Sequence, residues 1–140
     1  MATQPLHVRA EEGPHEATFM MWPVNRKVHP DQEFLDILQQ TIADIANAIA
    51  AFEPVIMLAA AEDQTRARRM LTKGVTLWDI PTEDLWARDA GPLFAFRGDD
   101  LVVSHLHFNG WGNKQIHRDD GKVALSRLVA VRFDSTNYVD

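Results

Sequence analysis

The stretch PVIMLAA, from Pro54 to Ala60, is apolar at every position and decides how the rest of the chain is interpreted. An alternating pattern would indicate a strand with one face in water, whereas a continuous apolar run of strand length is typical of a strand covered on both faces. Such strands belong to parallel sheets, whose neighbouring strands are joined through helices. This stretch therefore predicts a central strand in an α/β protein.

A long helix is predicted immediately before this strand, over residues 31–51. Its apolar residues recur at spacings of three and four, as expected of an amphipathic helix of about five turns. Pro30 suits the first helical position, and the carboxylates of Asp31 and Glu33 suit the positive end of the helix dipole. The residues expected to form the buried face are Phe34, Leu38, Ile42, Ile45 and Ile49.

Further elements follow on both sides. Ala17–Trp22 and Val75–Ile80 are short apolar runs that end at Pro23 and Pro81, and each predicts a buried strand, with Met20, Met21 and Trp22 in the core. The other expected elements are a helix over Glu62–Leu71, a hairpin of Leu93–Phe96 with Leu101–Phe108, and a helix over Val123–Ala130 capped by Asp119 or Asp120. Strands alternating with helices predict the α/β class.

Composition excludes several classes of protein. The 140 residues suit one domain, here 1–140, with an irregular segment at 1–16. Lys and Arg total 14 against 20 for Asp and Glu, and this net charge of −6 argues against a nucleic-acid partner. There is no cysteine, which excludes disulfides, thiolate metal sites and a cysteine nucleophile within these residues. No secretory leader and no apolar stretch of about 20 residues is seen, so we expect a cytoplasmic protein without a membrane partner.

The loop from Thr82 to Pro92 is the best candidate for chemistry, because it follows a predicted strand and concentrates carboxylates beside an indole. A carboxylate accepts the paired N–H groups of a guanidinium, and an aromatic face attracts the same planar cation. Arg88 would serve as the counter-charge that orients Asp89. The alternative is a loop whose charges simply face water. The residues in question are Glu83, Asp84, Trp86, Arg88 and Asp89.

Two other motifs in the sequence could contribute to a site. His105 and His107 lie two apart in a predicted strand and would point to one face, but no third metal ligand follows at a recognisable spacing, so no metal site is predicted. The other four histidines, His7, His15, His29 and His117, form no motif. In FNGWGNK at 108–114, Gly110 and Gly112 are expected to allow positive φ, and Trp111 either lines a pocket or only packs.

Three segments together resemble the agmatine deiminase family, which includes the bacterial Porphyromonas-type peptidyl-arginine deiminases. They are GPHEATFMMWP at 13–23, EDLWARDAGP at 83–92 and FNGWGNK at 108–114, supported by FEPVIML at 52–58. The resemblance covers about residues 10–130, whereas the tail 131–140 shows no family likeness. It implies a partial pentein fold, an α/β-propeller, with about two of its five ββαβ-type modules.

The resemblance also implies an activity: hydrolysis of the guanidino C–N bond of agmatine to N-carbamoylputrescine and ammonia, in putrescine biosynthesis and without a cofactor. Asp89 matches the carboxylate that grips the guanidinium, and Trp86 matches an aromatic residue beside the substrate. Asp84 and Arg88 fall on supporting positions of the motif. Trp111 and Asn109 fall on positions that we expect to shape their loop.

The sequence also departs from the family pattern. The family's nucleophile is a Cys in the last module and its acid/base His lies in a middle module, and the chain contains neither module. Glu83, Ala90 and Asn113 replace an Asp, a Thr and a Gly. We therefore expect no deiminase activity from this chain by itself. Open sheet edges would favour a homo-oligomer, and the alternative function is a non-catalytic module that binds amines or guanidines or is purely structural.

Overall fold

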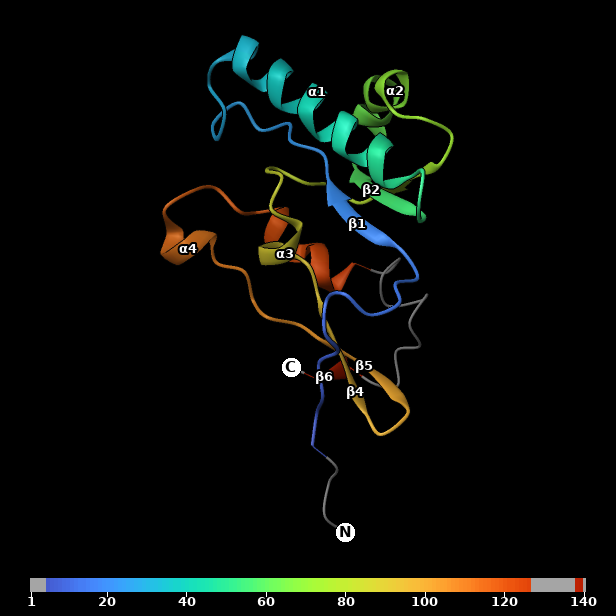
Figure 1. The fold of residues 1–140 in the computed structure, drawn as a ribbon. Coiled ribbons are helices and arrows are strands. Elements are labelled where there is room, and N and C mark those ends of the chain that lie inside the picture. The colour runs from blue at the N-terminus through green and yellow to red at the C-terminus, as the bar shows by residue number, and fades with distance from the viewer. Residues whose placement is uncertain (1–4, 127–137, 140) are drawn as a thin grey trace.

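The computed structural model of the chain describes residues 5–126 and 138–139. Three strands form a parallel sheet in the order β1-β2-β3, and the connections between them are the two long helices (Figure 1). The bounds are β1 Thr18–Met21, α1 Gln32–Ile49, β2 Val55–Ala59, α2 Ala61–Met70 and β3 Val75–Asp79. The predicted α/β class is confirmed, and the predicted bounds of these five elements agree to within about two residues.

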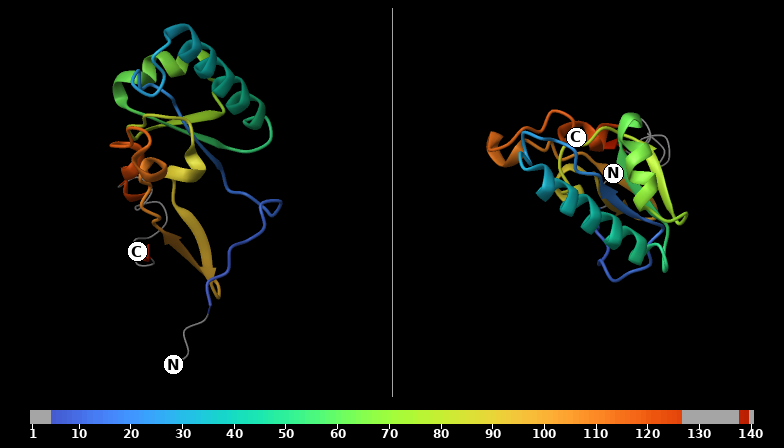
Figure 2. Two further views of the ribbon diagram at one scale, coloured as in Figure 1. Left: turned by 90° about the vertical axis from the view of Figure 1, so that its left-hand side faces the viewer. Right: turned by 90° about the horizontal axis from the view of Figure 1, so that it is seen from above.

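The central strand β2 is buried along its whole length, as its apolar sequence predicted. Val55 and Met57 point to the helices and join the cluster that contains Trp22 and Ala43. Ile56 and Leu58 point to the opposite face and pack in a second cluster with Met21, Ile80, Ala90 and Val123. Figures 1 and 2 show α1 and α2 on one side of this sheet and the later segments of the chain on the other.

Helix α1 begins as predicted but turns a different face to the sheet. The side chain of Asp31 accepts hydrogen bonds from the backbone N–H groups of Glu33 and Phe34, which caps the helix. Of the predicted face, Phe34 and Ile45 are exposed, and the buried residues are Leu35, Gln39, Ile42, Ala43 and Ala46. The small alanines let α1 lie close to β2, and Gln39 is satisfied there because its amide donates to the Pro23 carbonyl oxygen at 2.7 Å.

The second half of the chain forms a hairpin with β6 (Tyr138–Val139) beside it. β4 (Leu93–Arg97) pairs antiparallel with β5 (Asp100–Ser104), and β6 runs parallel to β5. β5 ends at Ser104, so the prediction that His105 and His107 share a strand is wrong. The ring of Phe19 in β1 lies 5.5 Å from that of Trp78 and 6.3 Å from that of Phe94, which links the two sheets.

A short helix packs on the face of the parallel sheet opposite to α1 and α2. η1 (Asp120–Leu125) is a 3₁₀ helix whose Val123 packs against Ala90, so the predicted helix over Val123–Ala130 is shifted and of a different type. Residues 127–130 of that prediction lie outside the described residues. None of the helices in the described ranges has the length and apolar character required to cross a bilayer.

Candidate functional site

Trp86 lies at the start of a single helical turn, α3 (Ala87–Ala90), and Asp89 lies within it. The sequence predicted a loop here. The turn forms because the backbone N–H groups of Asp89 and Ala90 both donate to the Trp86 carbonyl oxygen, at 3.1 and 3.2 Å. Gly91 ends it, and a Cβ at this position would collide with the carbonyl oxygen of Ala87. The side chains of Trp86 and Asp89 are both exposed, so this turn presents them to solvent.

Trp111 is presented by an unusual turn, α4 (Gly110–Asn113), in which all four residues have positive φ. The φ angles of Gly110 and Gly112 are +61° and +79°, which confirms the prediction for the two glycines. Trp111 itself has φ 53° and ψ 48°, the left-handed conformation that costs a residue with a Cβ about 1–2 kcal/mol. The turn is therefore built from two glycines and an asparagine, Asn113, around one strained tryptophan.

Asn109 and Gly110 fix the shape of this turn. The Asn109 side-chain oxygen accepts from the Gly112 N–H at 2.9 Å, and its carbonyl oxygen accepts from the Asn113 N–H at 2.8 Å. A Cβ on Gly110 would lie 2.6 Å from both the Gln115 carbonyl oxygen and a ring nitrogen of His117. These contacts hold the turn closed on Asn109.

The two loops meet at Asp89. The indole N–H of Trp111 donates to Oδ1 of Asp89 at 3.2 Å, and the rings of Trp86 and Trp111 lie edge to face with their centroids 6.4 Å apart. The ring of Phe108 also packs edge to face with that of Trp111, with their centroids 5.1 Å apart. An exposed carboxylate beside a pair of indole rings offers hydrogen-bond acceptors and aromatic faces to the same planar cation. We call Trp86, Asp89 and Trp111 the Asp89 cluster.

Asp84 lies apart from this cluster and is buried. Its Oδ1 is 3.0 Å from Nε2 of His29, and its Oδ2 accepts from the side-chain amide of Gln115 at 3.0 Å. Asp84 thus connects the segment before α1 to the segment after α4 and supports the loop without contacting solvent. His29, which no sequence motif singled out, belongs to this supporting network.

Glu83 and Asp120 bind each other's backbone. Oδ1 of Asp120 accepts from the Glu83 N–H at 2.7 Å and its Oδ2 accepts from the Asp84 N–H at 3.1 Å, while Oε2 of Glu83 accepts from the Asp119 N–H at 3.1 Å. Burial raises the pKa of Asp120 to about 6, and the carboxylates of Glu83 and Asp84 add to this, although the two amide donors lower it. This reciprocal pair holds η1 against the loop that leads into α3.

Arg88 has a different partner from the one that the sequence suggested. Its Nη1 lies 2.5 Å from Oε1 of Glu11, and both side chains are largely exposed. The prediction that Arg88 is the counter-charge of Asp89 is wrong, because successive residues of a helical turn point in different directions and Arg88 reaches the N-terminal segment instead. The hydrogen bond to Asp89 comes from Trp111.

His105 and His107 are neighbours in space, with ring centroids 4.1 Å apart, although they follow the strand that was expected to contain them. His105 is buried and His107 is exposed. Within residues 5–126 and 138–139, no group of three potential ligands converges on a metal position.

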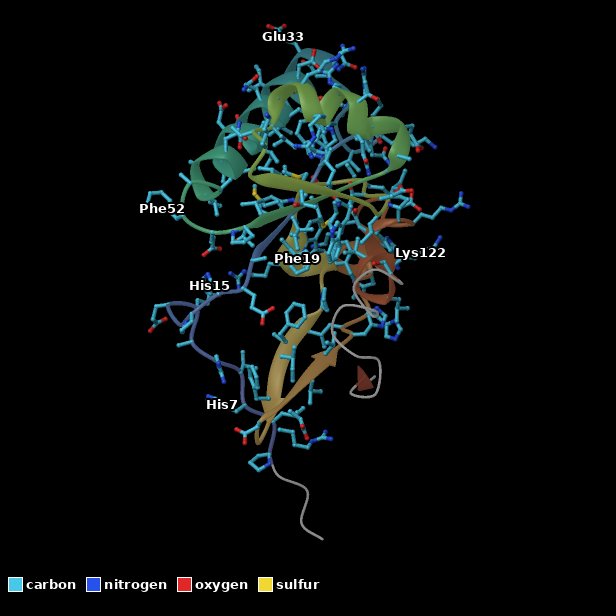
Figure 3. The ribbon with its side chains drawn as sticks, turned by 90° about the vertical axis from the view of Figure 1, so that its right-hand side faces the viewer. His7, His15, Phe19, Glu33, Phe52 and Lys122 are labelled. Atoms are coloured by element: carbon cyan, nitrogen blue, oxygen red, sulfur yellow. The ribbon has the colours of Figure 1, made fainter. Side chains whose placement is uncertain are left out.

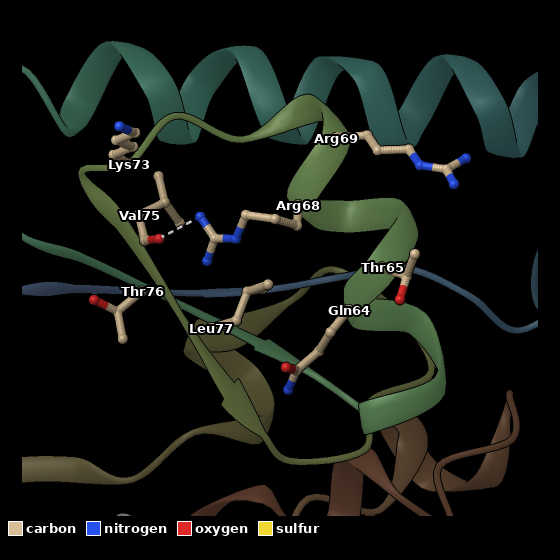
Figure 4. Close-up of a pocket in the computed structure, with 8 residues that line it drawn as sticks. All are labelled: Gln64, Thr65, Arg68, Arg69, Lys73, Val75, Thr76 and Leu77. Atoms are coloured by element: carbon tan, nitrogen blue, oxygen red, sulfur yellow. Dashed lines mark hydrogen bonds between the residues drawn. The ribbon is translucent and has the colours of Figure 1, made fainter.

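Two hollows occur at other places on the surface. One, of about 900 Å³, lies between α2 and β3 (Figure 4). It is bordered by Arg68, Arg69 and Lys73, and the positive charge of these three side chains would repel a cation. The guanidinium of Arg68 is held by the Val75 carbonyl oxygen at 2.9 Å, while Arg69 points away from it. The other, of about 480 Å³, lies beside α3 and is lined mainly by apolar residues of β1, β2, β4 and the N-terminal segment. This second hollow also has the carboxylate of Glu11 and the rings of Phe19 and Phe94 in its lining, but that carboxylate is paired with Arg88.

Residues 7–138 match the model of the Porphyromonas-type peptidyl-arginine deiminase family. The chain belongs to this family. Its curated relatives include a putative agmatine deiminase of Streptomyces coelicolor, 35% identical over 121 residues, which are 86% of this chain and 36% of the relative. An agmatine deiminase of Pseudomonas aeruginosa is 39% identical over 108 residues, 74% of this chain and 28% of the relative.

Solved structures of deiminases share the fold. The agmatine deiminase of Enterococcus faecalis has a TM-score of 0.74 at 18% identity, over 98% of this chain and 39% of the other. An agmatine deiminase of C. jejuni with substrate bound has a TM-score of 0.76 at 20% identity, over 98% and 40%. The predicted partial pentein fold is therefore confirmed. The chain spans about a third of the length of the curated family members named above.

Of the residues that the family resemblance singled out, the structure brings Trp86, Asp89 and Trp111 together and places Asp84 and Arg88 elsewhere. The sequence analysis missed three contributors to the deiminase-like loop: His29, Gln115 and Asp120. They lie between 31 and 55 positions from their partners Glu83 and Asp84. Asp120 was considered only as a helix cap, and no local pattern connects the others to the loop.

Proposed function

We propose that the Asp89 cluster binds the guanidinium group of agmatine and that this chain forms the substrate-gripping part of an agmatine deiminase. The observation that carries the proposal is the exposed Asp89 carboxylate, which accepts the indole N–H of Trp111, whose ring in turn packs against that of Trp86. The names of the curated relatives support agmatine over peptidyl-arginine as the substrate. The reaction would give N-carbamoylputrescine and ammonia and would place the protein in cytoplasmic putrescine synthesis.

The 140 residues by themselves are proposed to be inactive. Attack on the guanidinium carbon requires a nucleophile and a proton donor for the departing ammonia. The sequence contains no cysteine, which is the family's nucleophile, so the covalent intermediate cannot form on this chain. The purified chain should release no ammonia from agmatine above a buffer control, and measurable release would contradict this part of the proposal.

Binding is the test of the Asp89 cluster. Agmatine should bind with a dissociation constant on the order of millimolar, because the cluster supplies one wall of a site and the cost of association is offset by few contacts. Asp89→Asn keeps the shape of the side chain and removes its charge, so it should abolish binding. Asp99→Asn removes a charge from the exposed turn between β4 and β5 and serves as the matched control.

Comparison of agmatine with a neutral analogue makes this test specific for the guanidinium charge. N-carbamoylputrescine has the same chain length as agmatine but a neutral ureido group, so it should bind at least tenfold more weakly if Asp89 recognises the guanidinium charge. Titrations followed by ¹H–¹⁵N NMR would report both affinity and location. Equal binding of the two ligands, or of agmatine to wild type and Asp89→Asn, would overturn the proposal.

A homo-oligomeric module is the second candidate function. Exposed apolar side chains lie along α1 and at the turn that follows it: Phe34, Ile37 and Ile45 are 51%, 56% and 44% exposed, and Phe52 is 91% exposed (Figure 3). Apolar side chains grouped in this way favour contact with a second copy of the chain. Light scattering at micromolar concentration should show an oligomer that Phe34→Ser with Ile37→Ser reduces, and a monomeric wild type would contradict this candidate.

A further inference from the structure

The hydrogen bond between Trp111 and Asp89 uses one of the acceptor positions on the carboxylate that is proposed to bind a cation. The donor is the indole N–H and the acceptor is Oδ1, 3.2 Å away. The sequence assigned Trp111 only to shaping its loop or lining a pocket. The direct hydrogen bond to Asp89 indicates a further role for Trp111, because this bond restricts how the carboxylate can turn.

The backbone that carries Trp111 is strained and well supported. Trp111 is held in the left-handed region, where non-glycine residues with a large side chain are outliers. Hydrogen bonds from Gly112, Asn113 and Lys114 close the turn on Asn109 and Gly110 at 2.8–2.9 Å. Strain of this kind persists where the surrounding structure over-determines it, and it is concentrated at functional sites. The turn is therefore built to hold the indole in one place.

The ring contacts restrict the indole further. Phe108 packs edge to face against Trp111 with centroids 5.1 Å apart, and Trp86 lies across it at 6.4 Å. With the backbone fixed and the ring held between two aromatic neighbours, the indole N–H is a preorganised donor. A mobile flap that merely rests on Asp89 would have neither feature.

We propose that Trp111 is a positioning residue for Asp89. Its N–H fixes Oδ1 and leaves Oδ2, together with the remaining lone pair of Oδ1, to accept two parallel N–H bonds from a guanidinium. An ionised carboxylate offers about four lone-pair positions, so one indole donor and one bidentate ligand can be accommodated together. This inference rests on the proposed function of the Asp89 cluster and adds the group that orients it.

Removing the N–H without removing the ring is the decisive change. Replacement of Trp111 by 3-benzothienylalanine keeps both fused rings and puts a sulfur in place of the N–H, and Trp111→Phe is the genetically encoded version. Loss of a hydrogen bond to a charged group should weaken agmatine binding by about tenfold in both. Unchanged or tighter binding would overturn the proposal, and tighter binding would show that Trp111 competes with the ligand for Asp89.

A ligand-free measurement separates this inference from the proposed function. The indole ¹H–¹⁵N resonance that disappears in Trp111→Phe should lie further downfield in wild type than in Asp89→Ala, which has no acceptor for this N–H. The same indole position in wild type and Asp89→Ala contradicts the positioning role even if agmatine binds. If the indole resonance differs between wild type and Asp89→Ala but agmatine does not bind to wild type, the proposed function fails while the hydrogen bond stands.

Discussion

Two groups of side chains in the interior are stabilised by different interactions. One lies between the parallel sheet and its helices, and the other, which is buried only at its three carboxylates, lies beneath the 82–92 loop. The first is apolar: Trp22, Val55, Met57 and Ala46 are fully buried and contact one another without directional bonds. The second consists of Glu83, Asp84 and Asp120 with His29 and Gln115, joined by hydrogen bonds. The candidate site rests on the second.

This difference separates what holds the chain folded from what shapes its site. Apolar burial is non-directional and tolerates changes that preserve volume. A buried carboxylate is stable only when its donors lie in the right directions, and it costs free energy when one of them is lost. Substitutions in the two regions should therefore differ in kind: the first set lowers stability, and the second set also disturbs ligand binding at Asp89.

The largest expected effect is from the apolar cluster. Met57 is fully buried at the centre of β2, in register with Met20 and Leu77. Met57→Ala should lower the free energy of unfolding by about 2–5 kcal/mol, because it removes buried methylene groups and leaves a cavity. Urea denaturation would measure this. Phe52→Ala, at a position 91% exposed, should change the value by less than about 0.5 kcal/mol, and a comparable loss there would contradict the assignment of the core.

Asp120→Ala should be the next largest. It leaves the buried N–H groups of Glu83 and Asp84 without their acceptor, at a cost of about 1–3 kcal/mol. Because α3 follows this loop and packs on η1 through Ala90 and Val123, agmatine binding should weaken as well. Asp119→Asn is the control, since the Asp119 side chain makes no capping hydrogen bond. If Asp120→Ala is destabilised but binds agmatine normally, the hydrogen bonds of Asp120 do not shape the candidate site.

The contrast between the apolar cluster and the hydrogen-bonded group also explains how far the sequence could predict each region. The strand at 55–59 and the helix from Asp31 could be located because their signals are local: a continuous apolar run, and a cap followed by helical spacing. The buried face of α1 could not, because Phe34 and Ile45 are as apolar as the residues that it buries and only the packing of Ala43 and Ala46 on the sheet decides between them. Asp120 and His29 were missed because their partners Glu83 and Asp84 are distant in sequence.

The two glycines of α4 test the turn that carries Trp111. Gly110→Ala places a Cβ 2.6 Å from the Gln115 carbonyl oxygen at a φ of +61°, whereas Gly112→Ala meets no atom within 4 Å at a φ of +79°. Gly112→Ala should cost about 1 kcal/mol for its conformation alone, and Gly110→Ala should cost more because the neighbouring backbone must shift. Denaturation and agmatine titration would compare them. Equal losses would mean that the close approach at Gly110 does not matter.

The last expected effect is a pH dependence that comes from a single buried group. The pKa of Asp120 is about 6 in the folded chain against 3.8 for its ordinary value, so the folded state binds its proton more tightly than the unfolded state. Its contribution to stability is therefore greatest below about pH 4 and is lost as pH rises through 6, with a slope of at most about 1.4 kcal/mol per pH unit.

The pH dependence due to Asp120 can be separated from that of other carboxylates by subtracting the stability of a variant. The pKa of Glu53 is lowered, chiefly by the Thr18 hydroxyl, and this acts in the opposite direction by adding stability above its ordinary titration range. The free energy of unfolding of wild type minus that of Asp120→Asn, measured from pH 4 to 7, removes the shared terms and should fall with rising pH. Glu83 and Asp84 face Asp120 and His29 faces Asp84, so a difference that rises instead would mean that the amide donors outweigh burial and that this carboxylate is held ionised.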